Sequence, residues 1–102
     1  MSLPGLDPLI HAPVRLQICA ILAAADEAEF ALVREETGVS ESVLSKQVKL
    51  LEEAGYVAVR KATLASRQRT WLALTKAGRA AFAAHMQTLT RLAETASRVA
   101  AE

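Results

Sequence analysis

The sequence predicts a mainly α-helical domain with a small β-hairpin, in the order helix, short strand, helix, helix, strand, strand, helix. Three observations predict this fold class. Apolar residues recur with a helical period over residues 9–24. A second amphipathic segment lies between Gly38 and Gly55, and two β-type segments follow it. A long apolar stripe then runs along residues 75–99, so the chain is expected to end in a helix.

The first helix is expected over residues 9–24, with Pro13 in its first turn, where a missing backbone N–H is tolerated. The eight residues before it contain two prolines and one glycine. Such a composition favours turns over regular structure. We therefore expect residues 1–8 to form a loose lead-in.

The middle of the chain has the residues of a helix-turn-helix. Residues 29–30 are expected to form a short strand and residues 31–37 a short helix. Gly38 suits the left-handed residue that ends a helix, and Ser40 suits the N-cap of the next helix. Gly55 is then expected to end that second helix.

The helix that follows Ser40 has two different sides. Leu44, Val48 and Leu51 form an apolar side. The opposite side is polar and basic, and it consists of Ser42, Ser45, Lys46 and Lys49. A polar face is ordinary on any surface helix. The turn before this helix and the basic hairpin after it instead favour insertion of the polar side into a DNA major groove.

Positive charge is concentrated in the middle of the chain, although the net charge is only +1. Residues 40–79 contain eight Lys and Arg against three Asp and Glu, whereas residues 1–39 contain two against six. This distribution is the expected footprint of a surface that binds a polyanion.

A β-hairpin is predicted from residues 57–64 and 69–74, with residues 65–68 at its tip. Its basic residues are Arg60, Lys61, Arg67 and Arg69. A guanidinium at the tip can enter a narrow minor groove, so Arg67 is a candidate DNA contact. The other three are expected to bind phosphate groups.

Trp71 is the one large aromatic residue of the hairpin. If Leu72 and Leu74 face the core, alternation places Trp71 on the opposite sheet face. An exposed tryptophan there would indicate an interface. A shifted register would instead bury it, and the sequence favours neither outcome.

The last helix is expected to begin after Thr75, to reach about Val99, and to be roughly 36 Å long. A compact domain of this size has a radius near ~13 Å, so the helix should protrude and need a partner. We predict a homodimer interface that contains Phe82, Met86, Leu89 and Ala93, together with Trp71. The chain is expected to be a single domain, with a core over residues 9–75 and a dimerisation helix over residues 76–100.

Other functional classes receive little support. Cys19 lies among apolar residues and is expected to be a buried structural thiol. His11 and His85 are far apart in sequence and lack metal-ligand neighbours, and His85 is expected on the flank of the last helix. No catalytic set, metal site or cofactor motif is evident, so we do not expect an enzyme. The chain lacks a signal peptide and a membrane-spanning segment, so we expect a cytoplasmic protein.

The predicted element order is that of a winged helix, and the chain resembles the winged helix-turn-helix transcriptional regulators of the broad MarR/ArsR/PadR-like group. The resemblance extends from about Leu6 to Leu92. Its motifs are HAPVRL at residues 11–16, Phe30, GVS at 38–40, LSK at 44–46, VKLLEEAGYV at 48–57 and LTKAGR at 74–79.

The resemblance implies that the third helix reads the major groove, that the hairpin or wing contacts DNA, and that the terminal helix forms a homodimer. It assigns double-stranded DNA contacts to Ser40, Ser42, Ser45, Lys46, Lys49, Arg60, Lys61, Arg67 and Arg69. The expected function is a regulator, most simply a repressor, at a pseudo-palindromic operator, with a small-molecule effector as a further partner. Two alternatives are a protein-interaction module and a redox- or ligand-responsive sensor.

Overall fold

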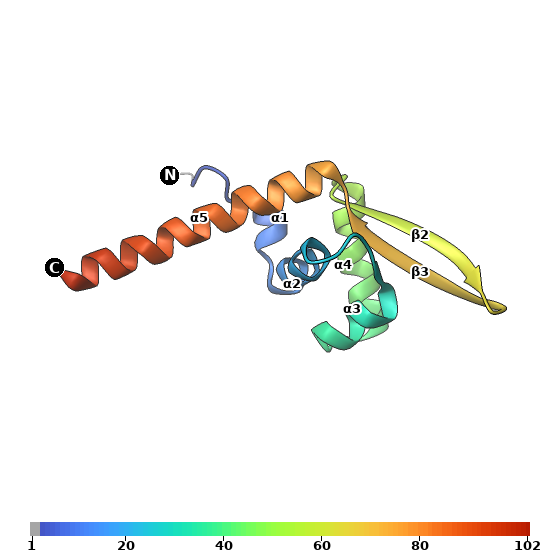
Figure 1. The fold of residues 1–102 in the computed structure, drawn as a ribbon. Coiled ribbons are helices and arrows are strands. Elements are labelled where there is room, and N and C mark those ends of the chain that lie inside the picture. The colour runs from blue at the N-terminus through green and yellow to red at the C-terminus, as the bar shows by residue number, and fades with distance from the viewer. Residues whose placement is uncertain (1–2) are drawn as a thin grey trace.

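The computed structural model describes residues 3–102 and has the predicted order of elements, except that two helices stand in place of the first one. A small helical body carries a hairpin on one side and a long helix on the other (Figure 1). The molecule measures 62 × 24 × 22 Å. Its elements are α1 (Pro8–His11), α2 (Pro13–Ala23), β1 (Ala28–Glu29), α3 (Phe30–Thr37), α4 (Glu41–Glu53), β2 (Val57–Leu64), β3 (Arg67–Leu74) and α5 (Lys76–Ala101).

The prediction of one helix over residues 9–24 is wrong, because the chain breaks at Ala12. This residue is extended, with φ −62° and ψ 136°, and separates α1 from α2. The cause is Pro13, whose ring disfavours a helical conformation for the residue before it. Asp7 caps the extra turn by accepting a hydrogen bond from the Leu9 N–H at 2.9 Å.

The lead-in is not loose where the structure describes it. The Thr88 hydroxyl donates to the Pro4 carbonyl at 2.6 Å, and the Asp7 N–H donates to His85 at 2.9 Å. These contacts fix the segment before α1 against α5. The first two residues of the predicted lead-in, Met1 and Ser2, lie outside the described residues.

The three strands form an antiparallel sheet in the order β1-β3-β2. The hairpin tip is shorter than predicted. Only Ala65 and Ser66 form the turn, and both have positive φ, 52° and 64°. A two-residue turn of this kind matches the twist of its strands, so pairing continues to Leu64 and Arg67. Arg67 is therefore the first residue of β3.

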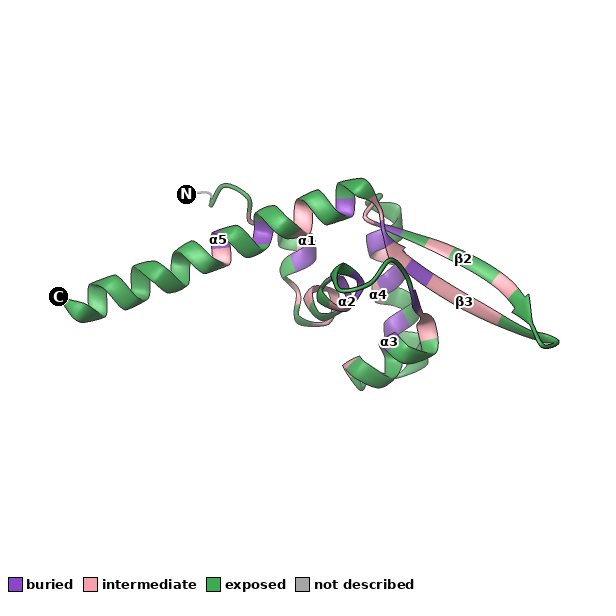
Figure 2. Ribbon diagram, in the orientation of Figure 1, coloured by how far each residue is buried: buried purple, intermediate pink, exposed green. Residues whose placement is uncertain are grey.

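One apolar core joins the helices of the body to the base of the sheet. Its members come from every layer and include Ile18, Leu22, Val33, Leu44, Leu51 and Leu72, all fully buried. Figure 2 shows that burial ends where the hairpin and α5 leave the body.

The predicted turn between α3 and α4 is confirmed. Gly38 is left-handed at φ 72°, and the Ser40 hydroxyl accepts from the Val43 N–H at 3.2 Å.

The near half of α5 packs on the body and the far half does not. The helix begins after Thr75, as predicted, and the Thr75 hydroxyl caps it by accepting from the Gly78 N–H at 3.0 Å. At Gly78 the backbone of α5 approaches the backbone of Tyr56 closely, since a Cβ there would lie 2.1 Å from the Tyr56 carbonyl oxygen. Every residue from 90 to 102 is exposed. Within residues 3–102, the helices lack the combination of length and apolar character that a bilayer span requires.

Candidate nucleic-acid interface

The structure confirms the two-sided character of α4. Leu44, Val48 and Leu51 are buried against the body. Residues 42, 46 and 49 lie roughly opposite them, because successive helical residues are about 100° apart. Ser42, Lys46 and Lys49 are all exposed. The core thus holds α4 by one side and leaves a hydroxyl and two ammonium groups on the other.

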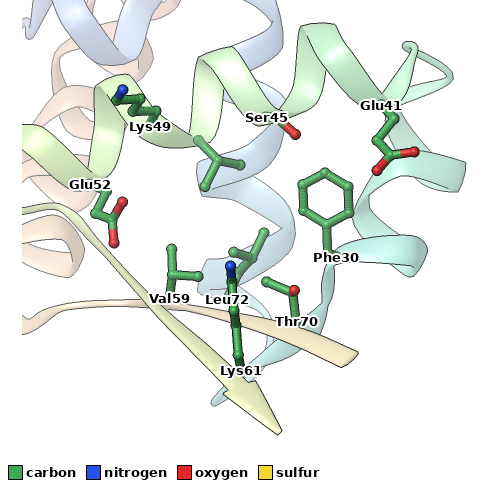
Figure 3. Close-up of a pocket in the computed structure, with 10 residues that line it drawn as sticks. Phe30, Glu41, Ser45, Lys49, Glu52, Val59, Lys61, Thr70 and Leu72 are labelled. Carbon is green, nitrogen blue, oxygen red and sulfur yellow. The ribbon is translucent and has the colours of Figure 1, made fainter. Parts of the chain in front are cut away.

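A groove of about 350 Å³ separates α4 from the wing, the hairpin formed by β2 and β3. Ser45 and Lys49 border it from α4, and the Lys61 side chain rises from β2 toward α4 (Figure 3). Phe30 closes one end of the groove. The groove also contains the carboxylates of Glu41 and Glu52, so it is not uniformly positive.

Gln47 points away from the exposed face of α4. Its Oε1 accepts a hydrogen bond from Nη1 of Arg15 on α2 at 2.6 Å. Gln47 therefore faces the first helices and not the exposed side of α4. Arg15 also donates through Nε to the Leu9 carbonyl, so this pair fixes α4 against α1 and α2.

The basic residues predicted on the wing divide between its two faces. Cross-strand partners share a face, so Lys61 and Thr70 lie with Val59 and Leu72 on the side of α4. Arg60 lies on the other face, which also contains Trp71. Arg67 is exposed at the start of β3, next to the turn.

On the outer face, two wing arginines make ion pairs with residues at β1. Nη2 of Arg60 lies 2.6 Å from Oε1 of Glu27, and Nη1 of Arg69 lies 3.4 Å from Oε2 of Glu29. The Arg60 guanidinium also lies over the Trp71 ring, 5.6 Å from its centroid. Both arginines therefore already have partners in the folded chain.

Trp71 is half-buried on the central strand, while Leu72 and Leu74 face the core as the unshifted register requires. The dimer residues predicted on α5 differ in exposure. Phe82 packs against the core, Leu89 is half-buried, and Met86 and Ala93 are exposed.

The sequence missed a polar network between the lead-in and α5. His85 is not on a flank but fully buried. Its Nδ1 accepts from the Asp7 N–H at 2.9 Å, so its proton lies on Nε2, which is 3.2 Å from Nδ1 of His11. Asp7 also accepts from the Tyr56 hydroxyl. Burial, and then the proximity of His11, lowers the pKa of His85.

The buried position of Cys19 argues against the redox-sensor alternative. Its side chain is fully buried, and burial together with nearby Asp7 raises the pKa of the thiol to about 11. A redox-reactive cysteine needs exposure and a lowered pKa. The reading of Cys19 as a structural thiol is confirmed.

Comparison with known proteins identifies a family and a fold. Residues 14–93 match the family model described as a winged helix DNA-binding domain. An uncharacterized protein of Methanocaldococcus jannaschii is 28% identical over 86 residues, which cover 84% of this chain and 94% of that protein.

Solved structures of transcriptional regulators are similar to this fold. A transcriptional regulator homologue from Pyrococcus horikoshii aligns with a TM-score of 0.80 at 24% identity, over 85% of this chain and 86% of that one. The transcriptional repressor BigR from Xylella fastidiosa aligns with a TM-score of 0.63 at 26% identity, over 76% and 74% of the two chains.

Proposed function

This chain belongs to the winged helix DNA-binding domain family, a family of binding modules rather than enzymes, and we propose that it regulates transcription by binding a specific sequence of double-stranded DNA. The observation that carries the proposal is the exposed face of α4, where Ser42, Lys46 and Lys49 lie opposite the buried core residues. The N-terminal turns of α4 enter the major groove, the site at which base edges are distinguishable.

The wing adds contacts beside α4 in this proposal. Lys61 binds a phosphate from the inner face of β2, and Arg67 reaches the minor groove from the end of the hairpin. The proposed DNA contacts from α4 and its cap are Ser40, Ser42, Ser45, Lys46 and Lys49. The hydroxyls and lysines of α4 specify sequence and position, whereas the wing contributes mainly affinity.

The test is fluorescence anisotropy with duplex DNA from upstream of the protein's own gene, across a salt series. Phosphate contacts release counterions, so log affinity should fall with log salt by about 0.9 per contact. Binding with this slope supports the proposal. No binding to any duplex at low salt would contradict it and favour the protein-interaction module.

We further propose that two copies of the chain act as a homodimer through α5. Met86, Leu92 and Val99 are 39%, 42% and 60% exposed on a helix that leaves the body. Pairing of two such helices would bury these apolar side chains. With Phe82, Leu89 and Ala93 beside them, two copies present two α4 helices to an operator whose half-sites lie about 10 bp apart or a multiple of that.

The dimer is tested by sedimentation of Leu92→Glu. A buried unpaired carboxylate is costly, so this variant should sediment as a monomer. Gln87→Glu is the matched control, because it adds the same charge at an exposed position on the side of α5 away from Phe82, Leu89 and Ala93. A wild-type monomer, or a Leu92→Glu dimer, would contradict the proposed interface.

The sign of regulation that we propose is repression, and the 26% identity to the repressor BigR supports it. A small-molecule effector is supported by NadR, a structural neighbour solved with 4-hydroxyphenylacetate, which aligns at a TM-score of 0.72 over 67% of its own chain. Addition of that compound to the anisotropy assay is a direct first test. An unchanged affinity would exclude this ligand as the effector.

A further inference from the structure

We propose that Arg60, Trp71 and Glu27 form a clip that sets the direction of the wing for DNA binding, and that Arg60 is a positioning residue rather than a phosphate contact. This inference rests on the proposed DNA-binding function. It concerns the outer face of the sheet, on the side opposite α4.

The three residues of the clip span the whole sheet at the base of the wing. Arg60 on β2 is the cross-strand partner of Trp71 on β3, and Glu29 on β1 is the partner of Trp71 on its other side. The Arg60 guanidinium lies 5.6 Å from the Trp71 ring centroid. It then reaches Glu27 through two contacts, at 2.6 and 3.4 Å, just before β1 begins. One side chain thus bridges both edge strands across the central one.

Among residues 3–102, the clip is one of two ion-paired contacts that tie the wing to the residues around β1, and the other is the longer Arg69–Glu29 pair at 3.4 Å. β1 contains two residues and pairs with β3 only at Leu72 and Trp71. Beyond that point the hairpin extends away from the body (Figure 1). Arg67 lies four residues before Trp71 on β3, toward the hairpin turn, or about 13 Å away at the usual strand rise. A tilt of about 10° at the base would therefore move Arg67 by about 2 Å, which is enough to break a hydrogen bond.

A phosphate role for Arg60 would require a different arrangement. Its side chain points away from the groove bordered by Lys61, and its guanidinium would have to leave both the ring and the carboxylate. The pair is partly exposed, with 54% of the Arg60 side chain and 39% of the Glu27 side chain accessible. Removal of Glu27 distinguishes the two roles. DNA binding should weaken if Arg60 positions the wing, and it should strengthen if Arg60 binds phosphate.

The experiment compares the DNA affinity of Glu27→Gln, Arg60→Gln and the double variant. If the clip positions the wing, both single variants should bind DNA about two- to fivefold more weakly, and the double variant no more weakly than the worse single. If Arg60 is a phosphate contact restrained by Glu27, then Glu27→Gln should bind more tightly and show a steeper salt slope. That result would overturn the proposal, as would no change at all.

Asp26→Asn is the matched control for charge. Asp26 is exposed, adjacent in sequence, and makes no ion pair with any residue in 3–102. Both substitutions raise the net charge by one, so a decrease seen only with Glu27→Gln comes from the clip. Arg67→Ala should also lose most of its effect in the Glu27→Gln background, because the wing tip is already displaced. A general loss of stability would not produce that coupling, and thermal unfolding of each variant checks for it.

A measurement without DNA separates this proposal from the proposed function. Trp71 is the only tryptophan of the chain, so its emission reports the clip directly. Arg60→Gln and Glu27→Gln should each shift the emission to longer wavelength as water reaches the ring, while Asp26→Asn should not. Unshifted emission would show that no clip forms, even if the wild-type protein binds DNA. Shifted emission in a protein that binds no duplex would keep the clip but overturn its role in DNA binding.

Discussion

The lysines of α4 differ from Arg60 and Arg69 of the wing in whether the folded chain already pairs them with a carboxylate. Lys46 and Lys49 are exposed and make no ion pair with any described residue. Arg60 and Arg69 both face carboxylates that come from the acidic first third of the sequence. The fold therefore brings part of the negative segment onto part of the positive one. Charge counted along a sequence is not the charge available to a polyanion.

The largest effect should come from the unpaired cations. We expect Lys46→Ala combined with Lys49→Ala to lower DNA affinity about a hundredfold and to reduce the salt slope by about two. Neither lysine has a described internal partner, so the free energy of unfolding should change little. Anisotropy in a salt series measures the first effect and urea titration the second.

Lys76→Ala is the control for this double variant, because Lys76 is an exposed lysine that belongs to α5 and not to α4. It should lower affinity much less per charge removed. Equal losses for Lys76 and Lys49 would mean that DNA senses only net charge. The distinction between the unpaired lysines of α4 and the ion-paired arginines of the wing would then not explain DNA affinity.

Much of the fold followed from local signals. The helix-turn-helix turn needed only a left-handed Gly38 and the capping hydroxyl of Ser40, and both signals act within a few residues. The buried side of α4 followed from its apolar period. Pro13 was also a local signal, because it disfavours a helical conformation at Ala12, and the expectation of one continuous helix overlooked it.

A smaller effect, on stability alone, should come from Arg79. Its guanidinium donates to the carbonyls of Ala25 at 2.9 Å and Ala23 at 3.5 Å, at the end of α2. These carbonyls lack helical partners, so Arg79→Ala should lower the free energy of unfolding by about 1 kcal/mol. DNA affinity and salt slope should stay unchanged. A shallower slope would place Arg79 among the DNA contacts instead.

The parts that the sequence could not predict depend on pairs far apart in the chain. Arg60 and Glu27 are separated by 33 residues, and Asp7 and His85 by 78. No period or spacing encodes such pairs, because each follows from how the elements pack. Likewise, the sequence does not show which face of the wing lies toward α4 and which carries the ion pairs near β1, because this depends on how the sheet packs.

The smallest effect we expect concerns His85, a basic group that the fold keeps neutral rather than pairing it with an anion or leaving it exposed. Its Nδ1 must stay unprotonated to accept from the Asp7 N–H, and its Nε2 proton faces His11. Burial is the main cause of its lowered pKa, with His11 second, while the charge of Asp7 acts in the opposite direction. Tyr56 faces this network as a neutral hydroxyl that donates to Asp7.

Because the folded pKa of His85 lies below its ordinary value of 6.5, the unfolded chain binds more protons in the interval between the two. Stability should therefore be complete above pH 6.5 and fall as the pH drops toward the folded pKa. His85→Gln should be less stable overall but should lose this pH-dependent decrease, because an amide does not titrate. Urea titrations at pH 8 and pH 5 measure the difference. Equal decreases in the two proteins would mean that another group, and not His85, loses its native contacts on acidification.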